Sequence, residues 1–356
     1  MRLDDFDYHL PEELIALEPA VERDASRLLH VCAGGVGHYQ FSDLPSLLRE
    51  GDLLVVNNTR VFPAALKVTR PARAEGGGGD VEVDINLLYP LAEKDGEVTW
   101  RAFARPAKRL REGDEVRVSP GLVGAVIRRD GGEVDLRFSL GSEDLMAAVE
   151  AAGDVPLPPY IARRRDVSDA DRDRYQTVYA AHSGSVAAPT AGLHFTSGVF
   201  EALSEKGIET AAVTLHVGPG TFLPVSVDDV ADHKMHSEWG EVTQAVADQV
   251  TRAKADGRRV VSVGTTSTRL LEAAATGRGE LSPFRAATDI FIAPGFEFRI
   301  VDALITNFHL PKSTLMMLIS AFAGLDRVKA AYAAAIEERY RFYSYGDACL
   351  LETADD

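Results

Sequence analysis

The chain is poor in cysteine, in long apolar runs and in basic residues, and each deficit excludes a class of protein. Two cysteines, Cys32 and Cys349, offer neither a disulfide framework nor a cysteine-based metal site. No apolar run approaches the length of a membrane span, and the opening residues, MRLDDFDYHL, lack the basic and apolar regions of a signal peptide. We therefore expect a soluble cytoplasmic protein with no bound metal ion. The sequence does not fix the oligomeric state, and we expect a monomer.

Acidic residues outnumber basic ones, 54 against 38, and the net charge is −16. This balance argues against a broad surface that coats nucleic acid, because phosphates bind where lysines and arginines gather. It leaves room for a local basic patch.

Strand-like and helix-like apolar patterns alternate over most of the chain. The expected strands are residues 28–31, 53–56, 209–215, 259–263 and 301–305, and the expected helices are residues 41–48, 197–205, 243–255, 267–275 and 315–322, with a further short helical pattern within residues 6–27. Such alternation predicts an α/β domain with a mostly parallel sheet. The length of 356 residues exceeds one typical domain, so we expect two.

The second domain is expected between residues 64 and 150, inserted into the α/β domain formed by residues 1–63 and 151–356. Short alternating strands separated by glycine-rich turns, with a flexible tip at residues 76–79, predict a small all-β barrel there. Residues 153–165 predict an extended, proline-rich connection that ends in three arginines. The insert also concentrates basic residues, among which Trp100 and Phe103 are interleaved: Arg101, Arg105, Lys108, Arg109, Arg111 and Arg117. Nucleic-acid binding and an ordinary solvated strand face explain this cluster equally well.

In one stretch, residues 288–324, most residues are apolar types typical of a buried core, and polar residues interrupt them. Asn307, His309 and Lys312 follow its expected strand, and Ser313 and Thr314 can cap the helix that comes next. In open α/β sheets, ligands bind where strands give way to helix N-termini. These three residues are therefore candidates for a site, although capping plus one hydrogen-bonded histidine would explain the loop by itself.

Four other loops carry polar side chains at or near the ends of expected strands. His194 lies in AAPTAGLHF, His216 opens HVGPGTF, and His236 and Glu238 lie in HKMHSE. In VGTTSTRLLE, a buried strand gives way to a helix whose free N–H groups could hold an anion. The His-x-x-His spacing of HKMHSE also suits a metal or a plain surface loop, but we favour acid–base chemistry there. Because buried polar groups need partners, their concentration at strand ends favours one shared pocket.

Long motifs along nearly the whole chain resemble one family. The chain is similar to the S-adenosylmethionine:tRNA ribosyltransferase-isomerases of queuosine biosynthesis in DFDYHLPEELIA, RDASRLL, VVNNTRVFPA, VPLPPYI, DRYQTVYA, AAPTAGLHF, HVGPGTF, HKMHSE, VGTTSTRLLE, TDIFIAPGFEF, VDALITNFHLPKSTLMMLISAFAG and RFYSYGDACL. It differs from the family pattern at Ala65, where we expect arginine, and at His182.

The resemblance implies an α/β domain with an inserted β-barrel, and it implies a reaction. The ribosyl part of S-adenosylmethionine would be moved to the aminomethyl group of 7-aminomethyl-7-deazaguanine at the wobble position of tRNA. The products would be epoxyqueuosine in tRNA, adenine and methionine. S-adenosylmethionine would be a consumed substrate, and no cofactor is expected, in keeping with the absence of a glycine-rich methyltransferase fingerprint.

Roles for individual residues are hypotheses on this basis. The expected acid–base set is His194, His216, His236 and Glu238. The expected S-adenosylmethionine contacts are Gly264, Thr265, Thr266, Thr268, Asp289, Asn307 and His309. The expected contacts with tRNA phosphates are Arg60, Arg105, Lys108, Arg109, Arg163, Arg164 and Arg165. Two other classes compete with this interpretation: a zinc hydrolase built on His233, His236 and Glu238, and a tRNA-binding module without enzymatic activity.

Overall fold

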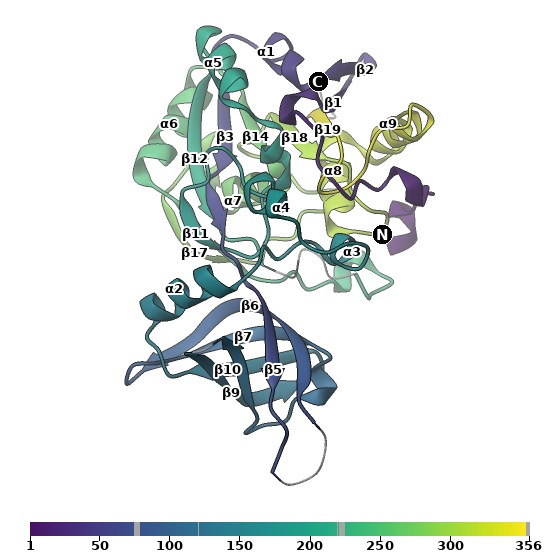
Figure 1. Ribbon diagram of the computed structural model, residues 1–356. Coiled ribbons are helices and arrows are strands. Elements are labelled where there is room, and N and C mark those ends of the chain that lie inside the picture. The colour runs from purple at the N-terminus through teal and green to yellow at the C-terminus, as the bar shows by residue number, and fades with distance from the viewer. Residues whose placement is uncertain (75–78, 120, 219, 221–224, 354–356) are drawn as a thin grey trace. The chain divides into compact units, whose positions relative to one another are not determined.

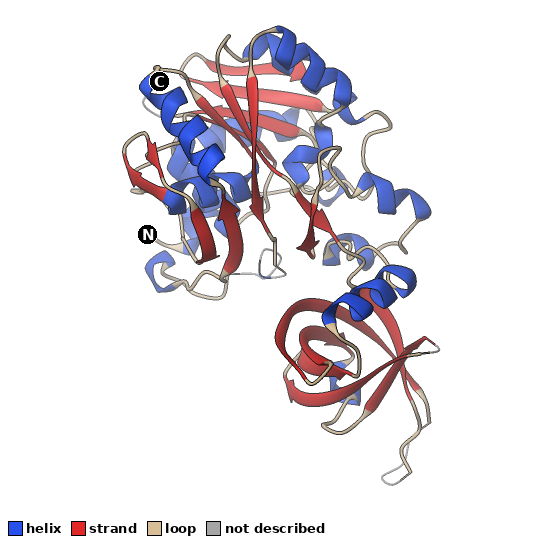
Figure 2. Cartoon of the chain, turned by 90° about the vertical axis from the view of Figure 1, so that its left-hand side faces the viewer, coloured by secondary structure: helices blue, strands red, loops and turns tan. Residues whose placement is uncertain are grey.

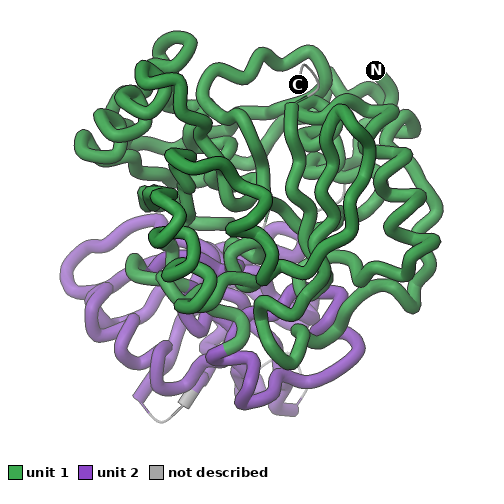
Figure 3. The backbone as a smooth tube through the Cα atoms, turned by 90° about the horizontal axis from the view of Figure 1, so that it is seen from above, with its two compact units in different colours: residues 1–60, 174–182, 188–356 green, residues 61–173, 183–187 purple. Residues whose placement is uncertain are grey.

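The computed structural model describes residues 1–74, 79–119, 121–218, 220 and 225–353. The chain forms two compact units (Figure 3). The first comprises residues 1–60, 174–182 and 188–356, and the second comprises residues 61–173 and 183–187. The sequence predicts an insert over residues 64–150. The second unit also takes in the segment after residue 150 and the short stretch at residues 183–187.

The first unit is built on a nine-stranded sheet (Figure 1). Its strand order is β17–β13–β12–β3–β14–β18–β19–β1–β2. The strands are β1 Arg27–Cys32, β2 Gly35–Gln40, β3 Leu53–Asn57, β12 Glu209–Leu215, β13 Glu238–Val242, β14 Val260–Val263, β17 Phe284–Thr288, β18 Ala303–Asn307 and β19 Ala348–Glu352. Two short pairs complete the strands near this unit: β4 Thr59–Val61 with β11 His182–Ser185, and β15 Ala275–Gly277 with β16 Glu280–Leu281.

The centre of the sheet is parallel. Strands β12, β3, β14 and β18 run in one direction, with Ala211, Val55, Ser262 and Leu304 side by side. On one side β13 runs antiparallel to β12 and β17 runs antiparallel to β13, and on the other β19 runs antiparallel to β18 while β1 runs parallel to β19. The predicted α/β fold with a mostly parallel sheet is thus confirmed.

Helices cover both faces of the sheet (Figure 2), which explains why the central strands read as unbroken apolar runs. In β3, Leu54 and Val56 pack with Val199 and Leu203 of α5, whereas Leu53 and Val55 face the other way and are equally buried. The helices of this unit are α1 Leu44–Leu47, α5 Ser197–Glu205, α6 Gln244–Ala255, α7 Gly264–Ala274, α8 Thr314–Ala323 and α9 Leu325–Glu337, and α4 Asp169–Arg174 ends at its boundary. None of the described helices is long and apolar enough to cross a bilayer.

Three predictions about local structure are wrong: one predicted helix is absent, and two predicted elements have different bounds. The helix expected within residues 6–27 is replaced by 3-10 turns at Leu3–Phe6, Glu12–Leu14 and Arg23–Ala25. Pro11 and Pro19 leave too little uninterrupted chain for a stable helix. The last predicted strand lies two residues later, at Ala303–Asn307, because Thr306 and Asn307 pair with β19. Helix α7 begins at Gly264, three residues before its predicted start.

The second unit contains a closed six-stranded barrel, as the sequence predicts. Its strand order is β10–β7–β6–β5–β8–β9, and each neighbouring pair is antiparallel. The strands are β5 Ala65–Arg70, β6 Val81–Lys94, β7 Glu97–Arg105, β8 Glu115–Ser119, β9 Leu122–Asp130 and β10 Glu133–Phe138. Gly124 has no side chain because a Cβ there would lie 2.9 Å from the Phe138 ring. Residues 76–78 of the predicted tip lie outside the described residues.

Elements beyond the barrel strands extend this unit. Helix α2, Ser142–Ala152, packs Leu145 and Val149 onto the barrel core, and Val186 joins the same core. These contacts explain why α2 and Val186 belong to the second compact unit. The segment predicted to be extended at residues 153–165 includes a short helix, α3 Pro159–Ala162.

Candidate active site

Seven strand ends in the first unit meet at one edge of the sheet. The carboxyl ends of β12, β3, β14 and β18 lie there because these strands are parallel. Strand β13 starts at the same edge, since Gly240 pairs with Leu215, and β17 ends there, since Thr288 pairs with Glu238. Strand β19 also starts there, with Ala348 beside Asn307. The fold therefore gathers the polar loops of the sequence at a single edge, as expected of a ligand site in an α/β sheet.

Asn57, the last residue of β3, ties three of these loops together. Its side chain accepts hydrogen bonds from the backbone N–H groups of Leu215 and Thr59, at 3.0 and 3.2 Å. It donates to the Leu215 carbonyl at 2.9 Å and to Thr266 Oγ1 at 3.3 Å. Asn57 is fully buried, so these bonds replace the water that its amide loses on folding. Asn57 thereby fixes where His216 and the start of α7 lie.

His216 follows β12 and is held in one orientation. Its Nδ1 lies 2.8 Å from Thr59 Oγ1, and its ring stacks on Trp239 with centroids 5.2 Å apart. The Thr59 hydroxyl also faces the His182 carbonyl at 3.5 Å, which suits a hydroxyl that donates there and accepts the Nδ1 proton. Burial lowers the pKa of His216. Its Nε2 has no hydrogen-bond partner among the described residues, so a neutral His216 offers an open lone pair.

Glu238 forms a buried ion pair with Arg269. Its Oε2 accepts from Arg269 Nη1, its Oε1 accepts from the Gly218 N–H at 2.9 Å, and both charged side chains are about 95% buried. Arg269 also donates from Nε to the Ile290 carbonyl at 3.2 Å. The pair therefore links α7, β13 and the loop after His216. This geometry favours a positioning role for Glu238 over the acid–base role predicted from sequence.

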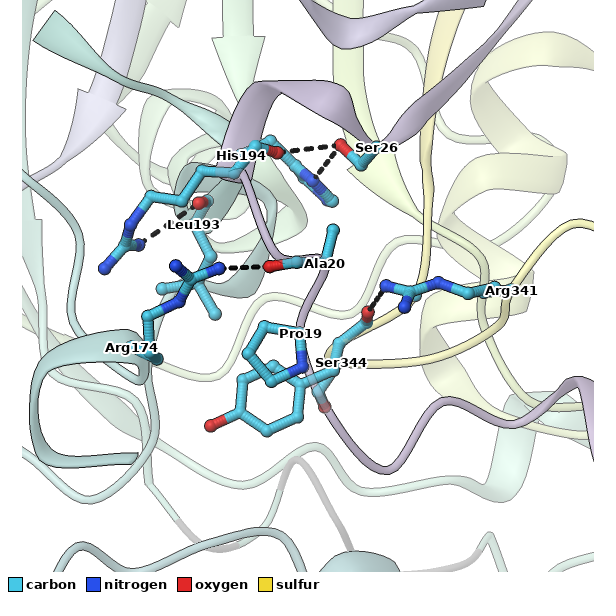
Figure 4. Close-up of a pocket in the computed structure, with 11 residues that line it drawn as sticks. Pro19, Ala20, Ser26, Arg174, Leu193, His194, Arg341 and Ser344 are labelled. Atoms are coloured by element: carbon cyan, nitrogen blue, oxygen red, sulfur yellow. Dashed lines mark hydrogen bonds between the residues drawn. The ribbon is translucent and has the colours of Figure 1, made fainter. Parts of the chain in front are cut away.

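His194 uses both ring nitrogens in hydrogen bonds. Its Nδ1 lies 2.7 Å from Ser26 Oγ, which donates to the Arg23 carbonyl at 3.0 Å (Figure 4). Its Nε2 lies 3.1 Å from Nδ2 of Asn307, and Thr190 Oγ1 donates to Asn307 Oδ1 at 2.8 Å. This network requires a proton on Nδ1 and a lone pair on Nε2 that the Asn307 amide already occupies. His194 can act as a base only if Asn307 moves away.

The pocket drawn in Figure 4 lies beside His194. Arg174 and Arg341 line it together with Ser26 and Tyr345. Arg174 donates to the Ala20 carbonyl, and Arg341 donates to the Tyr345 carbonyl at 2.5 Å. Both guanidinium groups thus hold backbone segments in place around the pocket.

His309 follows Asn307 by two residues and is as buried as His194. Its Nε2 lies 2.9 Å from Thr306 Oγ1, and its backbone N–H donates to the Tyr332 hydroxyl at 2.9 Å. Burial lowers the pKa values of both His194 and His309 to about 3. Both are therefore neutral at physiological pH. Lys312, the third candidate of this stretch, forms ion pairs with Asp4 and Asp7 at 2.9 and 3.1 Å and does not join the site.

These two histidines predict an acid-sensitive fold. Above pH 6.5 each is neutral in both the folded and the unfolded chain. Between pH 6.5 and about 3 only the unfolded chain takes up the protons, so stability falls as pH falls. In His309→Gln, urea unfolding at pH 6.5 and 5 should show a loss about 2 kcal/mol smaller than in the wild type. An equal loss in both proteins would mean that His309 is already protonated in the folded state.

The residues predicted to bind S-adenosylmethionine differ in burial: some are buried and others are exposed or half-buried. Gly264 has φ of +87°, a conformation that suits glycine at the point where β14 turns into α7. Thr266 is half-buried, whereas Thr268 is buried and bonds to Ser262 Oγ at 2.9 Å and to the Gly264 carbonyl at 3.2 Å. Thr265 is buried as well, and Asp289 is exposed just after β17. Thr266 is thus the hydroxyl of this set best placed to meet a ligand at the α7 N-terminus.

The arginines and the lysine predicted to contact tRNA lie at the surface with one exception. Arg165 is held by the buried Asp171 through two bonds of 2.6 and 2.8 Å, and therefore stabilises its own unit. The others are exposed: Arg60, Arg105, Lys108, Arg109, Arg163 and Arg164. Within the wider basic cluster, Arg101 is paired with Asp135 and Glu133, and Trp100 lies in the barrel core. This part of the cluster is structural.

The zinc-hydrolase alternative finds no support in the geometry. His233 packs against Phe291, Glu238 is held by Arg269, and His236 is exposed with its ring against Gly220. Across the part of the chain that the structure describes, one group of three potential ligands comes close together, and it is His30, Cys32 and Glu352 at the other edge of the sheet.

Several residues outside the predicted site set organise the site. Asn57, Thr59, Trp239, Arg269 and Ser26 all contact predicted site residues. The polar run Asn57–Asn58–Thr59 directly after a buried strand is a site signature in the sequence, although an ordinary turn would explain it as well. Nothing local marks Ser26, whose partner His194 is 168 residues away.

Comparisons with known proteins give one answer. Residues 3–351 match a family described as queuosine biosynthesis protein. The chain is 56% identical over 354 residues to the S-adenosylmethionine:tRNA ribosyltransferase-isomerase of Maricaulis maris and 52% identical over 354 residues to that of Parvibaculum lavamentivorans, with 99% of each chain covered. It also resembles the crystal structure of S-adenosylmethionine tRNA ribosyltransferase from Thermotoga maritima, with 34% identity and a TM-score of 0.54 over 97% of this chain and 99% of that one.

Proposed function

The chain belongs to the family of queuosine biosynthesis proteins, and we propose that it works as an S-adenosylmethionine:tRNA ribosyltransferase-isomerase. It transfers and isomerises the ribosyl part of S-adenosylmethionine onto 7-aminomethyl-7-deazaguanine at the wobble position of tRNA. Epoxyqueuosine, adenine and methionine result. The observation that carries this proposal for the chain itself is the convergence of seven strand ends, with their histidines, amides and threonines, at one sheet edge. S-adenosylmethionine is a consumed substrate, and the reaction needs no further cofactor.

The reaction requires a base that removes a proton from the carbon next to the sulfonium, and an acid that helps adenine to leave. A neutral imidazole with an open nitrogen can take a proton near neutral pH. Of the four predicted acid–base residues, His216 fits best, since its lowered pKa keeps it neutral and its Nε2 has no described partner. The stack on Trp239 and the contact with Thr59 hold its ring in place.

The other three residues take different parts in this proposal. His236 is exposed beside Gly220 and is the remaining candidate for the acid. Glu238 positions the loop after His216 through the Gly218 N–H. His194 orients Asn307, whose amide lines the site at the end of β18. Asn307, His309 and Asp289 then surround the substrate together with the start of α7.

The N-terminus of α7 holds the methionine or ribose end of S-adenosylmethionine in this account. The first N–H groups of a helix attract oxygen atoms, and no side chain caps this one. Thr266→Val keeps the shape of the side chain but removes its hydroxyl. We expect Thr266→Val to weaken S-adenosylmethionine binding about fivefold to tenfold in calorimetry, because one hydrogen bond is lost. Thr276→Val, an exposed threonine of β15, is the control, and equal binding by both variants would remove Thr266 from the site.

The tRNA substrate is held by a narrow set of basic side chains rather than by a basic face. Arg60, Arg105, Lys108, Arg109, Arg163 and Arg164 are exposed and meet phosphates, and single-stranded recognition then lets the wobble base leave its stack. We propose that the enzyme works in the cytoplasm as a monomer. Affinity for tRNA should fall steeply as salt rises.

The product identifies the reaction. The protein is incubated with S-adenosylmethionine and tRNA that carries 7-aminomethyl-7-deazaguanine. The tRNA is then digested, and the masses of its nucleosides are measured by mass spectrometry. A nucleoside with the mass of epoxyqueuosine is the expected result. A gain of a single methyl group, or an unchanged nucleoside with intact protein, would contradict the proposal.

A further inference from the structure

A buried arginine, Arg70, lies at the end of the barrel where β5 ends and β6 begins. In β5, Leu66 and Val68 point inward, and Arg70 occupies the next inward position at the end of the strand. Alternation along a barrel strand places such a residue in the interior. Arg70 is only 3% exposed, so its charge has lost most of its contact with water.

The charge of Arg70 has no carboxylate partner among the described residues. Its Nη1 donates to the Pro71 carbonyl at 2.7 Å, and its Nε is buried without any partner. The nearby Asp114 is already occupied, since Arg73 binds both of its oxygens and the Arg111 N–H donates to one of them at 2.7 Å. The hydrogen bond from Arg73 and, to a smaller extent, the charge of Arg70 lower the pKa of Asp114, so two guanidinium groups share one carboxylate. A buried charge that lacks a counter-ion of its own is costly, and an added anion would stabilise this arrangement.

Arg70 lines a hollow together with three more arginines. Arg73 is neutralised by Asp114, and Arg117 is paired with Glu115 at 2.7 Å. Arg111 lines the same hollow, is exposed and forms no ion pair with a described residue. Glu112 lines the hollow as well, so its four arginines and three carboxylates leave one net positive charge there, in a chain whose net charge is −16.

The hollow lies at the same end of the barrel as three of the basic residues predicted to bind tRNA. The antiparallel register places the end of β5, the start of β6 and the end of β7 at one end of the barrel. Arg105 ends β7, and Lys108 and Arg109 follow it. Arg73 Nη2 donates to the Arg109 carbonyl at 3.1 Å, which joins the two groups directly.

We propose that this hollow binds one phosphodiester phosphate of the tRNA backbone, held by the Arg70 and Arg111 guanidinium groups. A planar guanidinium presents two parallel N–H groups that match the oxygens of a phosphate. The tRNA assignment rests on the proposed function. The contact carries no sequence information and serves to position the substrate.

The test measures how tRNA binding depends on salt. Unmodified tRNA transcript is titrated with the full chain at several chloride concentrations. Arg70→Gln and Arg111→Gln should each weaken binding about tenfold at low salt and each reduce the slope of log affinity against log salt by about one. Arg137→Gln, on β10 at the other end of the barrel, is the matched control and should keep the wild-type slope.

Each other outcome has a defined meaning. In a Trp239→Phe background, fluorescence of Trp100 checks that Arg70→Gln keeps the barrel folded, and Arg111→Gln tests the same site from an exposed position. Wild-type slopes in both variants would overturn the proposal. A second result would also overturn it. If the variants keep wild-type slopes and inorganic phosphate at constant ionic strength stabilises the wild type but not Arg70→Gln, the hollow binds a free anion and not tRNA. If both variants have reduced slopes but the wild-type protein modifies no tRNA, the proposed reaction is wrong and the phosphate site remains supported.

Discussion

Replacing His216 with alanine should lower the rate of ribosyl transfer by a factor of about 100 to 10,000, the range that a positioned general base contributes. The reason is the open Nε2 of a neutral ring that Thr59 and Trp239 hold in place. Binding of S-adenosylmethionine, measured by calorimetry, should change much less. Single-turnover kinetics with both substrates at saturation separate the chemical step from binding.

Two further variants define the role of His216. His38→Ala removes a histidine of β2 that bonds to Tyr340 and lies outside the site, and its rate should stay at the wild-type level. Thr59→Val should lower the rate less than His216→Ala does and should change its pH profile. In this variant the His216 imidazole is still present, but the hydroxyl that selects its tautomer is gone. In the wild type, the rate should fall on the acidic side below pH 6.5 as His216 becomes protonated. A wild-type rate in His216→Ala would remove this residue from the acid–base set.

Breaking the buried pair of Glu238 and Arg269 should destabilise the first unit by about 3–5 kcal/mol, because one charge stays buried without its partner. Either Glu238→Met or Arg269→Met makes this break. The double variant should lose less than the sum of the two, with a coupling energy of about 1–3 kcal/mol. It still leaves the Gly218 N–H and the Ile290 carbonyl without their partners, so we do not expect wild-type stability.

Urea unfolding measures these changes. The chain has two tryptophans, Trp100 in the barrel and Trp239 in the first unit, so a Trp100→Phe background lets fluorescence follow the first unit alone. Arg285→Met is the control, since Arg285 and Glu241 form an exposed pair on β17 and β13 and such pairs contribute about 0–1 kcal/mol. Additive losses in the double variant would show that Glu238 and Arg269 do not stabilise one another.

The fold was predictable to the extent that local patterns determine it. The run Leu53–Val56 is apolar on both faces and can only be a strand covered on both sides, and the predicted bounds of α5 coincide with Ser197–Glu205. Ser313 caps α8 through a bond of 3.1 Å from the Met316 N–H, as its position before the apolar run indicates. The opening residues were predicted wrongly because their apolar spacing is helical, while their prolines limit helix length.

The candidate site was predictable as a set of loops but not as a set of roles. Strand-end loops must meet in a parallel sheet, and this places His216, Thr266 and Asn307 at one edge from sequence alone. Which groups remain available for chemistry depends on partners far along the chain. Ser26 occupies one nitrogen of His194, Arg269 occupies Glu238, and Asp4 and Asp7 occupy Lys312. No local pattern contains these contacts, so only the folded chain separates the open histidine from the enclosed ones.

The central claim is that this chain consumes S-adenosylmethionine in a reaction that requires the modified tRNA. The most direct measurement incubates the protein with S-adenosylmethionine labelled in its adenine and follows free adenine by chromatography. We predict adenine release with tRNA that carries 7-aminomethyl-7-deazaguanine, and none with tRNA that carries guanine at the wobble position. Release that is independent of the tRNA, or no release from folded protein that binds both substrates, would contradict the account.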